Sequence, residues 1–176
     1  MVKSYDRSAK EMIGFIYRER TDFWEKQAKK HSLQLFHKAC QSVVAYNDFL
    51  YKNGINVKEI KTWEDFQKIP IIHKNNYLSK YSLTELSWRD SYRNTLVFTS
   101  TSGSTGEPFY FPRSFLLDWQ SSVFHELFLR YGDSKEKGQI LVIVAFGMGV
   151  WIGGLITYRA FEICGIRSKY PISIIT

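Results

Sequence analysis

Apolar side chains recur every three or four positions along the first part of the chain, with charged residues between them. Over residues 8–30 this spacing is typical of an amphipathic helix. The same spacing over residues 32–52 predicts a second helix, which Asn53 and Gly54 are expected to end.

Local signals predict shorter helices in the next stretch of the chain. Thr62 and Asp65 are spaced as a capping box at the start of a short helix. Pro70 is expected to end it, because the residue before a proline avoids the helical region. Residues 82–88 are expected to form another short helix. Residues 1–90 are therefore expected to be a mainly helical segment.

The rest of the chain, residues 91–176, alternates short β-type runs with helical spacing, which is the pattern of an α/β segment. The runs 95–98 and 109–111 flank a loop of small residues and predict a β-hairpin. Ser114 is a suitable N-cap for the helix that follows, and Gly132 is expected to end that helix. Its apolar stripe is expected to face the core and comprises Phe115, Leu116, Trp119, Val123, Phe124, Leu127 and Phe128.

A run of 19 residues without a charged side chain, 140–158, is long enough to be weighed as a membrane span. Its internal pattern favours a βαβ unit, because 140–144 is β-branched and a glycine-rich turn follows it. We expect a helix over 151–164, ended by Gly165, and a further strand over 166–175. A span through a membrane is the alternative.

Composition fits a folded domain: the chain has 176 residues, of which 44% are hydrophobic. The net charge of +7 suits anionic partners, but the basic residues are scattered apart from a cluster at 26–31, which a solvated helix face explains. Nucleic-acid binding would rest on charge alone and is not expected. Cys40 and Cys164 lie outside any CxxC motif, so we expect reduced core cysteines in a cytoplasmic protein. His31 and His37 have no third ligand near them, so no metal site is expected.

Residues 99–108 concentrate small hydrogen-bond donors, with six hydroxyls and two glycines in ten positions. Glycines allow backbone N–H groups to approach a ligand closely, and hydroxyls add side-chain donors, so the loop suits a polyphosphate. A Walker loop is excluded, because Gly103 and Gly106 are too close together and no lysine follows. On composition alone, an ordinary Ser/Gly surface turn remains an alternative.

The order of these residues adds to the composition. From Thr101 to Gly106, followed by one residue and Pro108, the chain resembles the phosphate-binding signature of the adenylate-forming superfamily, which includes acyl-CoA synthetases, luciferases and peptide-synthetase adenylation domains. Many members have a lysine on each side of the proline. Here Glu107 and Phe109 stand at these two positions, and the phenylacetate–CoA ligase branch also lacks the second lysine. The resemblance implies that the β- and γ-phosphates of ATP bind to Thr101, Ser102, Gly103, Ser104, Thr105 and Gly106.

A second motif lies in the glycine turn between the strand 140–144 and the helix after it. A dinucleotide fingerprint is weak here, because its third glycine is displaced and no acidic residue ends the next strand. The stretch 146–154 resembles instead the aromatic–glycine turn of phenylacetate–CoA ligases. The resemblance implies that this turn borders an acyl pocket, in which glycines leave room and aromatic side chains line the wall. The implied pocket residues are Phe146, Gly147, Met148, Gly149, Trp151 and Gly153.

The resemblance implies a fold and a reaction. The fold would be part of the large N-terminal α/β domain of an adenylate-forming enzyme: a helical segment, a β-hairpin phosphate loop and a βαβ unit. The reaction would join a carboxylic acid to the AMP portion of ATP, with Mg²⁺, and pass the acyl group to coenzyme A or another acceptor. We identify no residue as a catalytic base, nucleophile or metal ligand.

The later motifs of the superfamily do not occur in the chain. We therefore expect an N-terminal part of a larger ligase, inactive alone, whose partners are the carboxylic acid substrate and the remaining C-terminal part of the enzyme. A homodimer is left open. The alternative function is a non-catalytic module that docks on a partner or on a membrane.

Overall fold

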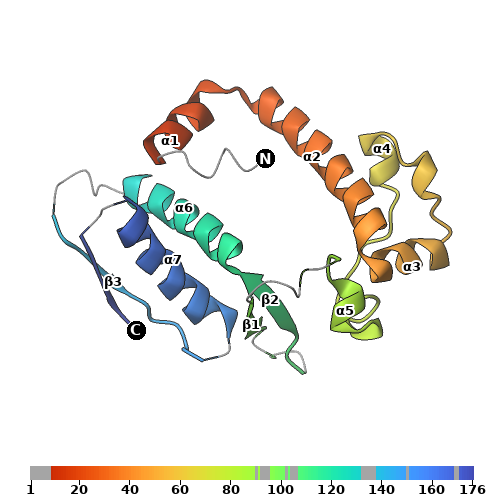
Figure 1. Cartoon of the computed structure of the whole chain (residues 1–176). Helices are drawn as coiled ribbons and strands as arrows, with labels where there is room; N and C mark the ends of the chain where they lie inside the picture. Colours follow the sequence, from red (N-terminus) through yellow and green to blue (C-terminus); the bar gives the residue numbers. More distant parts are fainter. Residues whose placement is uncertain are drawn as a thin grey trace. The chain divides into compact units, whose positions relative to one another are not determined.

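The computed structural model describes residues 9–89, 91, 96–101, 103, 107–131, 138–149, 151–168 and 171–176 (Figure 1). Helices and two small sheets make it α/β in the general sense. The chain divides into two compact units: a helical unit of residues 19–93, and an α/β unit of residues 1–18 and 94–176. The first helix of the chain thus groups with the C-terminal part.

The helical unit begins with a long helix that turns at Val43 into a shorter one. Its elements are α2 (Thr21–Ser42), α3 (Val44–Lys52), the 3₁₀ turn η2 (Val57–Glu59), α4 (Trp63–Phe66), the 3₁₀ turn η3 (Leu78–Lys80) and α5 (Leu83–Leu86). The predicted end of the second helix is confirmed: α3 stops at Lys52, and Gly54 adopts a left-handed φ of 70° that glycine tolerates best.

The predicted division of the first two helices is wrong. The first helix, α1 (Ala9–Arg18), ends well before residue 30, and α2 runs without a break through His31 to Ser42. The physical reason is packing: Leu33 and Phe36 lie on one face of α2 and enter the core, so the helix continues past the predicted break at residue 31. The real break comes at Val43, which is extended and separates α2 from α3.

Both short helices of the unit begin with a capping box. At α4, the Thr62 hydroxyl accepts the N–H of Asp65 at 3.2 Å, and the Asp65 carboxylate accepts the N–H of Thr62 at 3.1 Å, as predicted. At α5, Ser82 and Glu85 make the same reciprocal pair. The helix expected over 82–88 is present, but it is shorter, ending at Leu86.

The core of the helical unit is apolar and rich in aromatic rings. Phe36 meets Tyr46 edge-to-face at 6.0 Å between centroids, and Phe49 meets Tyr77 at 5.4 Å. Burial raises the pKa of Tyr46 and of Tyr77 to about 12, so both phenols stay neutral at physiological pH. The fully buried residues of this core are Phe36, Val43, Ala45, Phe49, Leu50, Ile60 and Tyr77.

The α/β unit consists of a hairpin, two long helices and a small parallel sheet (Figure 1). After α1, its elements are β1 (Leu96–Ser100), β2 (Tyr110–Ser114), α6 (Phe115–Tyr131), β3 (Ile140–Ile143), α7 (Ile152–Ser168) and β4 (Ile172–Ile175). The strands β1 and β2 pair antiparallel, whereas β3 and β4 pair parallel on either side of α7 in the sequence. The predicted hairpin and the predicted βαβ unit are therefore confirmed.

The glycine expected to end the last helix does not do so. Gly165 lies inside α7, which continues to Ser168, and the following strand begins at Ile172. Among the described residues, none of the helices is both long and apolar enough to cross a membrane. Gly132, the expected end of α6, lies outside the described residues.

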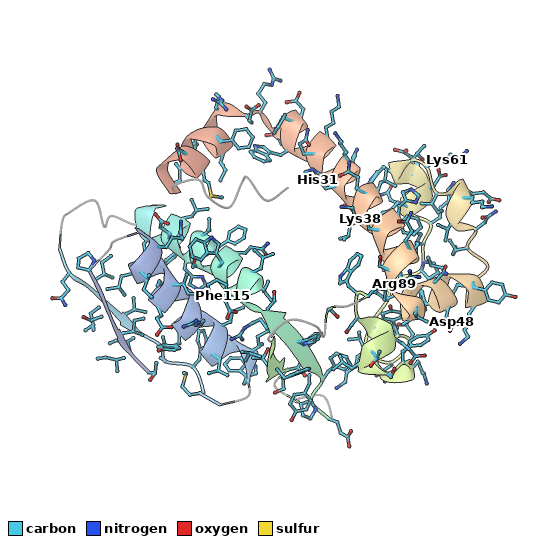
Figure 2. All side chains as sticks on the ribbon, in the orientation of Figure 1. His31, Lys38, Asp48, Lys61, Arg89 and Phe115 are labelled. Atoms are coloured by element: carbon cyan, nitrogen blue, oxygen red, sulfur yellow. The ribbon has the colours of Figure 1, made fainter. Side chains whose placement is uncertain are left out.

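The buried face of helix α6 differs from the face predicted from its apolar residues. Val123 is 2% exposed as predicted, but Phe124 is 68% and Phe128 is 72% exposed, so the expected core stripe is wrong for these two positions. The prediction is also wrong for Leu116 and for Phe115, which is labelled in Figure 2, because both side chains are exposed. The buried face carries polar side chains in their place, namely Asp118, Ser122 and Glu126. Arginines of β2 and α7 pair with the two acids, which explains how this face can be buried.

Candidate functional site

The neck of the hairpin is closed at Thr101. Its N–H donates to the carbonyl of Phe109 at 3.0 Å, and its hydroxyl accepts the N–H of Phe109 at 3.0 Å. The backbone N–H of Thr101 is therefore occupied by the hairpin, while its hydroxyl keeps a proton that could be donated to a ligand. Gly103 adopts a left-handed φ of 69°, which a glycine accommodates without strain.

The remaining predicted phosphate-binding residues lie outside the described residues. They are Ser102, Ser104, Thr105 and Gly106. Thr101 and Gly103 thus mark the described part of the loop, between the end of β1 and the start of β2.

The two motifs singled out in the sequence come together in the α/β unit. Ser100, the last residue of β1, forms a parallel β-bridge with Trp151, one residue before α7 begins. These positions are far apart along the chain, yet the bridge sets the entry of the small-residue loop beside the aromatic–glycine turn. Ser100 is itself almost completely buried at this junction.

The aromatic–glycine turn folds back on the first turn of α7, where close contacts leave no space for a side chain at Gly153 or Gly154. A Cβ on Gly154 would lie 2.5 Å from the carbonyl oxygen of Gly147 and 2.9 Å from Sδ of Met148. A Cβ on Gly153 would lie 2.5 Å from the ring of Trp151. Gly149 has a φ of 124°, which side chains other than glycine rarely adopt.

The turn presents an aromatic wall. Phe146 and Trp151 meet edge-to-face, with ring centroids 5.5 Å apart and planes at 72°. Phe146 and Met148 are partly exposed, and Trp151 is half-buried. Of the six predicted pocket residues, all lie on this turn or on the first turn of α7, and none of them carries a charge.

A buried ion pair lies where β2 meets α6, and sequence reasoning missed it. Arg113 Nε and Asp118 Oδ1 are 2.6 Å apart, with side chains 4% and 6% exposed. The distance is that of an ion pair, but the two atoms are not aligned for a hydrogen bond. Arg113 Nη1 and the hydroxyl of Thr99 also have no hydrogen-bond partner among the described residues. The only sequence signal was two opposite charges flanking an expected strand–helix junction.

The other reactive side chains give no competing catalytic centre in the part of the chain that the structure describes. His125 is packed: its Nδ1 lies 2.8 Å from the carbonyl oxygen of Ser121, and its ring meets Phe161 edge-on. Burial raises the pKa of Cys40 to about 11, which disfavours the thiolate. No group of three or more His, Cys, Asp or Glu side chains among the described residues is placed to hold a metal ion.

Two hollows of similar size lie among the described residues of the helical unit. One, of about 440 Å³, lies at the corner of α2 and α3 and includes Asp48 and Arg89, both labelled in Figure 2. The other, of about 420 Å³, is an open apolar groove lined in part by Phe36, Phe66 and Trp88. The predicted site residues are absent from both linings.

A comparison of the sequence with models of protein families and with curated proteins finds no match.

Proposed function

We propose that this chain carries the triphosphate-binding loop and part of the acyl pocket of an ATP-dependent ligase that activates carboxylic acids as acyl-adenylates. Its fold would be part of the large N-terminal domain of such an enzyme. The observation that carries the proposal is the bridge between Ser100 and Trp151. Two separate stretches of the sequence resemble motifs of the same superfamily, and a functional pair of motifs should lie side by side.

The chemistry explains why such a pair is needed. A carboxylate is a poor electrophile, and attack of its oxygen on the α-phosphorus of ATP gives a mixed anhydride while pyrophosphate leaves. The triphosphate must be held in line with the carboxylate, which favours neighbouring binding sites for the two. Donors in the loop would stabilise charge on the departing pyrophosphate. In this proposal Mg²⁺ arrives bound to the phosphates of ATP and supplies positive charge there.

The aromatic wall supports an apolar acyl group. Phe146 and Trp151 form an uncharged edge-to-face pair, and Gly153 and Gly154 allow the turn to pack closely on the start of α7. An aromatic ring or an aliphatic chain would bury apolar surface against this pair. Coenzyme A is the acyl acceptor we propose, in a cytoplasmic enzyme, and the free state of Cys40 and Cys164 is compatible with a reducing compartment.

The test measures the exchange of pyrophosphate into ATP that depends on a carboxylic acid. The assay uses the full-length protein that the gene encodes. Replacing Ser104 and Thr105 by alanine removes two donors from the loop, and we expect the exchange rate to fall at least about tenfold, since single transition-state donors are worth that much or more. Thr84→Ala, which removes an exposed hydroxyl on α5, is the matched control. An exchange rate that is the same in all three proteins would refute the role of the loop.

A second function, docking without catalysis, is favoured by one observation. Phe124 and Phe128 are highly exposed on α6, and contiguous exposed apolar side chains often mark interaction surfaces. Under this alternative, the purified protein would fail to bind inorganic tripolyphosphate, and Phe124→Gln with Phe128→Gln would abolish the interaction that the surface serves. Binding of tripolyphosphate that depends on Ser104 and Thr105 favours the ligase.

A further inference from the structure

The hairpin joins α6 with no connecting loop. Strand β2 ends at Ser114 and α6 starts at Phe115, so Ser114 is both the last strand residue and the helix cap. The hydroxyl of Ser114 accepts the N–H of Leu117 at 3.4 Å. Because no loop separates the two elements, the angle between β2 and α6 depends on the backbone of Ser114 and on side-chain contacts between the strand and the helix. We call this junction the corner.

The ion pair of Arg113 and Asp118 spans this corner. Arg113 is the last residue of β2 before Ser114, and Asp118 lies in the first turn of α6. Their charged groups are 2.6 Å apart and nearly completely buried. The pair therefore ties the outgoing strand of the loop hairpin directly to the helix.

Stability alone is a poor explanation for this pair. A buried ion pair recovers its desolvation cost only with good geometry and full hydrogen bonding, and apolar side chains of the same volume are often as stabilising. Here Nε, Nη1 and Oδ1 all lack an aligned hydrogen-bond partner among the described residues. Polar groups that are kept buried at a cost are typical of functional sites.

The distribution of buried polar side chains points to the same place. Among the described residues, every buried polar or charged side chain lies on β1, β2 or α6. They are Thr99, Ser100, Arg113, Asp118, Ser122 and Glu126. The buried core of the helical unit contains only apolar and aromatic residues. The polar interior is thus confined to the hairpin and to the helix that carries it.

The position of the loop depends on the angle between the hairpin and α6. Phe109 lies five residues before Ser114, which is about 17 Å of extended strand at about 3.4 Å per residue, so a tilt of about 10° at the corner moves the loop by about 3 Å. Misplacement of a binding group by about 1 Å can already cost a large factor in rate. We propose that Arg113 and Asp118 are positioning residues, which fix the angle of the hairpin on α6 and so hold the loop against the ligand. This inference rests on the proposed phosphate-binding role of the loop.

The decisive variant replaces both partners by apolar side chains of similar size, Arg113→Met with Asp118→Leu. If the pair serves only the fold, the folded double variant should keep its affinity for inorganic tripolyphosphate, whether or not its melting temperature changes. If the pair positions the loop, the melting temperature should stay within a few degrees while the dissociation constant rises at least about tenfold. Isothermal titration calorimetry and thermal unfolding measure the two quantities on the same protein.

Two further variants complete the experiment. Arg113→Lys keeps the charge pair and should recover most of the affinity. The matched control is the other buried pair of α6, changed as Glu126→Leu with Arg167→Met, which should leave the affinity within about twofold of the wild type. This pair also joins an arginine to a carboxylate and is nearly as buried, but it is hydrogen-bonded and ties α6 to α7 away from the corner.

The outcomes separate this inference from the proposed function. Wild-type affinity in the Arg113→Met and Asp118→Leu double variant overturns the positioning role, as does loss of its folded state, which would mean that the pair is needed for the fold itself. If the Ser104→Ala and Thr105→Ala protein binds tripolyphosphate as tightly as the wild type, or the wild type does not bind it, the proposed function fails and this inference fails with it. Weak binding by the loop variant and normal binding by the corner variant overturns this inference alone.

Discussion

Glycine 154 lies in the first turn of α7, where a glycine is normally unfavourable. In a helix interior, replacement of glycine by alanine usually stabilises by about 0.5–1 kcal/mol. At this position the new Cβ would lie 2.5 Å from the carbonyl oxygen of Gly147, a backbone atom that cannot swing away. The contact should reverse the usual sign of the substitution.

We therefore expect Gly154→Ala to destabilise the protein by about 1–3 kcal/mol, the range of overpacking substitutions. Urea denaturation followed by circular dichroism measures the change. The control is Gly147→Ala in the same turn, where an added Cβ would have no atom within 4 Å, and it should stay within about 0.5 kcal/mol of the wild type. A Gly154→Ala protein as stable as the wild type would mean that the turn does not fold back on α7.

Asp65 is the most strongly hydrogen-bonded carboxylate of the helical unit's caps. The ammonium of Lys68 lies 3.0 Å from Oδ1, and the Thr62 hydroxyl and the N–H groups of Thr62 and Lys61 donate to Oδ2. These donors, led by Lys68, lower the pKa of Asp65 below its ordinary value of 3.8. The unfolded chain lacks them, so the carboxylate binds a proton more readily when unfolded.

This difference makes a prediction about acid. The contribution of Asp65 to stability is fully present above its ordinary pKa and is lost as the pH falls from about 5 towards the lower folded-state pKa. We expect the urea midpoint to drop between about pH 5 and pH 3, and Asp65→Asn to reduce that drop. Asp22→Asn, which removes an exposed partner of Arg20, serves as the control. An acid profile that is unchanged in Asp65→Asn would contradict the prediction.

At the scale of elements, α6 shows what a hydrophobic pattern can and cannot predict. The periodicity of its apolar residues predicted the helix, and Ser114 predicted its N-cap. Both predictions are correct, because both depend on residues close together in the chain. It could not predict which face is buried, because Arg113 and Arg167, which make the polar face buriable, come from other elements. The ion pair at the corner was missed for the same reason: its partners belong to a strand and a helix whose angle the sequence does not specify.

The boundaries of the helices follow a similar rule. Capping at Thr62 and the stop at Gly54 were predictable, since each depends on residues adjacent in the chain. Gly165 failed as a stop because α7 packs along α6, with Ala160 and Cys164 completely buried, and that packing outweighs the poor helix propensity of one glycine. The meeting of the loop with the aromatic turn at Ser100 and Trp151 was implied only by resemblance, because nothing local encodes a β-bridge between distant residues.

The exposure of α6 gives a prediction at the same scale. Phe124→Gln and Phe128→Gln should each change the free energy of unfolding by less than about 0.5 kcal/mol, because both side chains are mostly in solvent. Val123→Ala, one position away and buried, should cost about 1–3 kcal/mol. Urea denaturation of the three variants ranks them. Equal losses at Val123 and Phe124 would show that the helix buries its apolar stripe after all.

At the scale of the whole molecule, the two units differ in how well they bury their apolar residues. Most of the large apolar side chains that are exposed among the described residues belong to the α/β unit, including Leu141 and Ile143 on β3. A two-stranded parallel sheet with one open apolar face is an uncommon arrangement, because parallel sheets are usually covered on both faces. The helical unit, in contrast, has a continuous core drawn entirely from its own residues.

We therefore expect residues 19–93, produced alone, to fold cooperatively. All buried residues of its core lie within this range, and both capping boxes are local, so removal of the rest of the chain takes away none of the contacts that define the core. A sigmoidal urea transition, with near-ultraviolet circular dichroism from the packed aromatic rings, would support this. Phe36→Ala in the same fragment should cost about 3–5 kcal/mol, enough to unfold a small domain. A gradual transition that Phe36→Ala does not change would mean that the helical unit needs residues outside 19–93 in order to fold. The two units would then be regions of dense contact but would not be independent folding units.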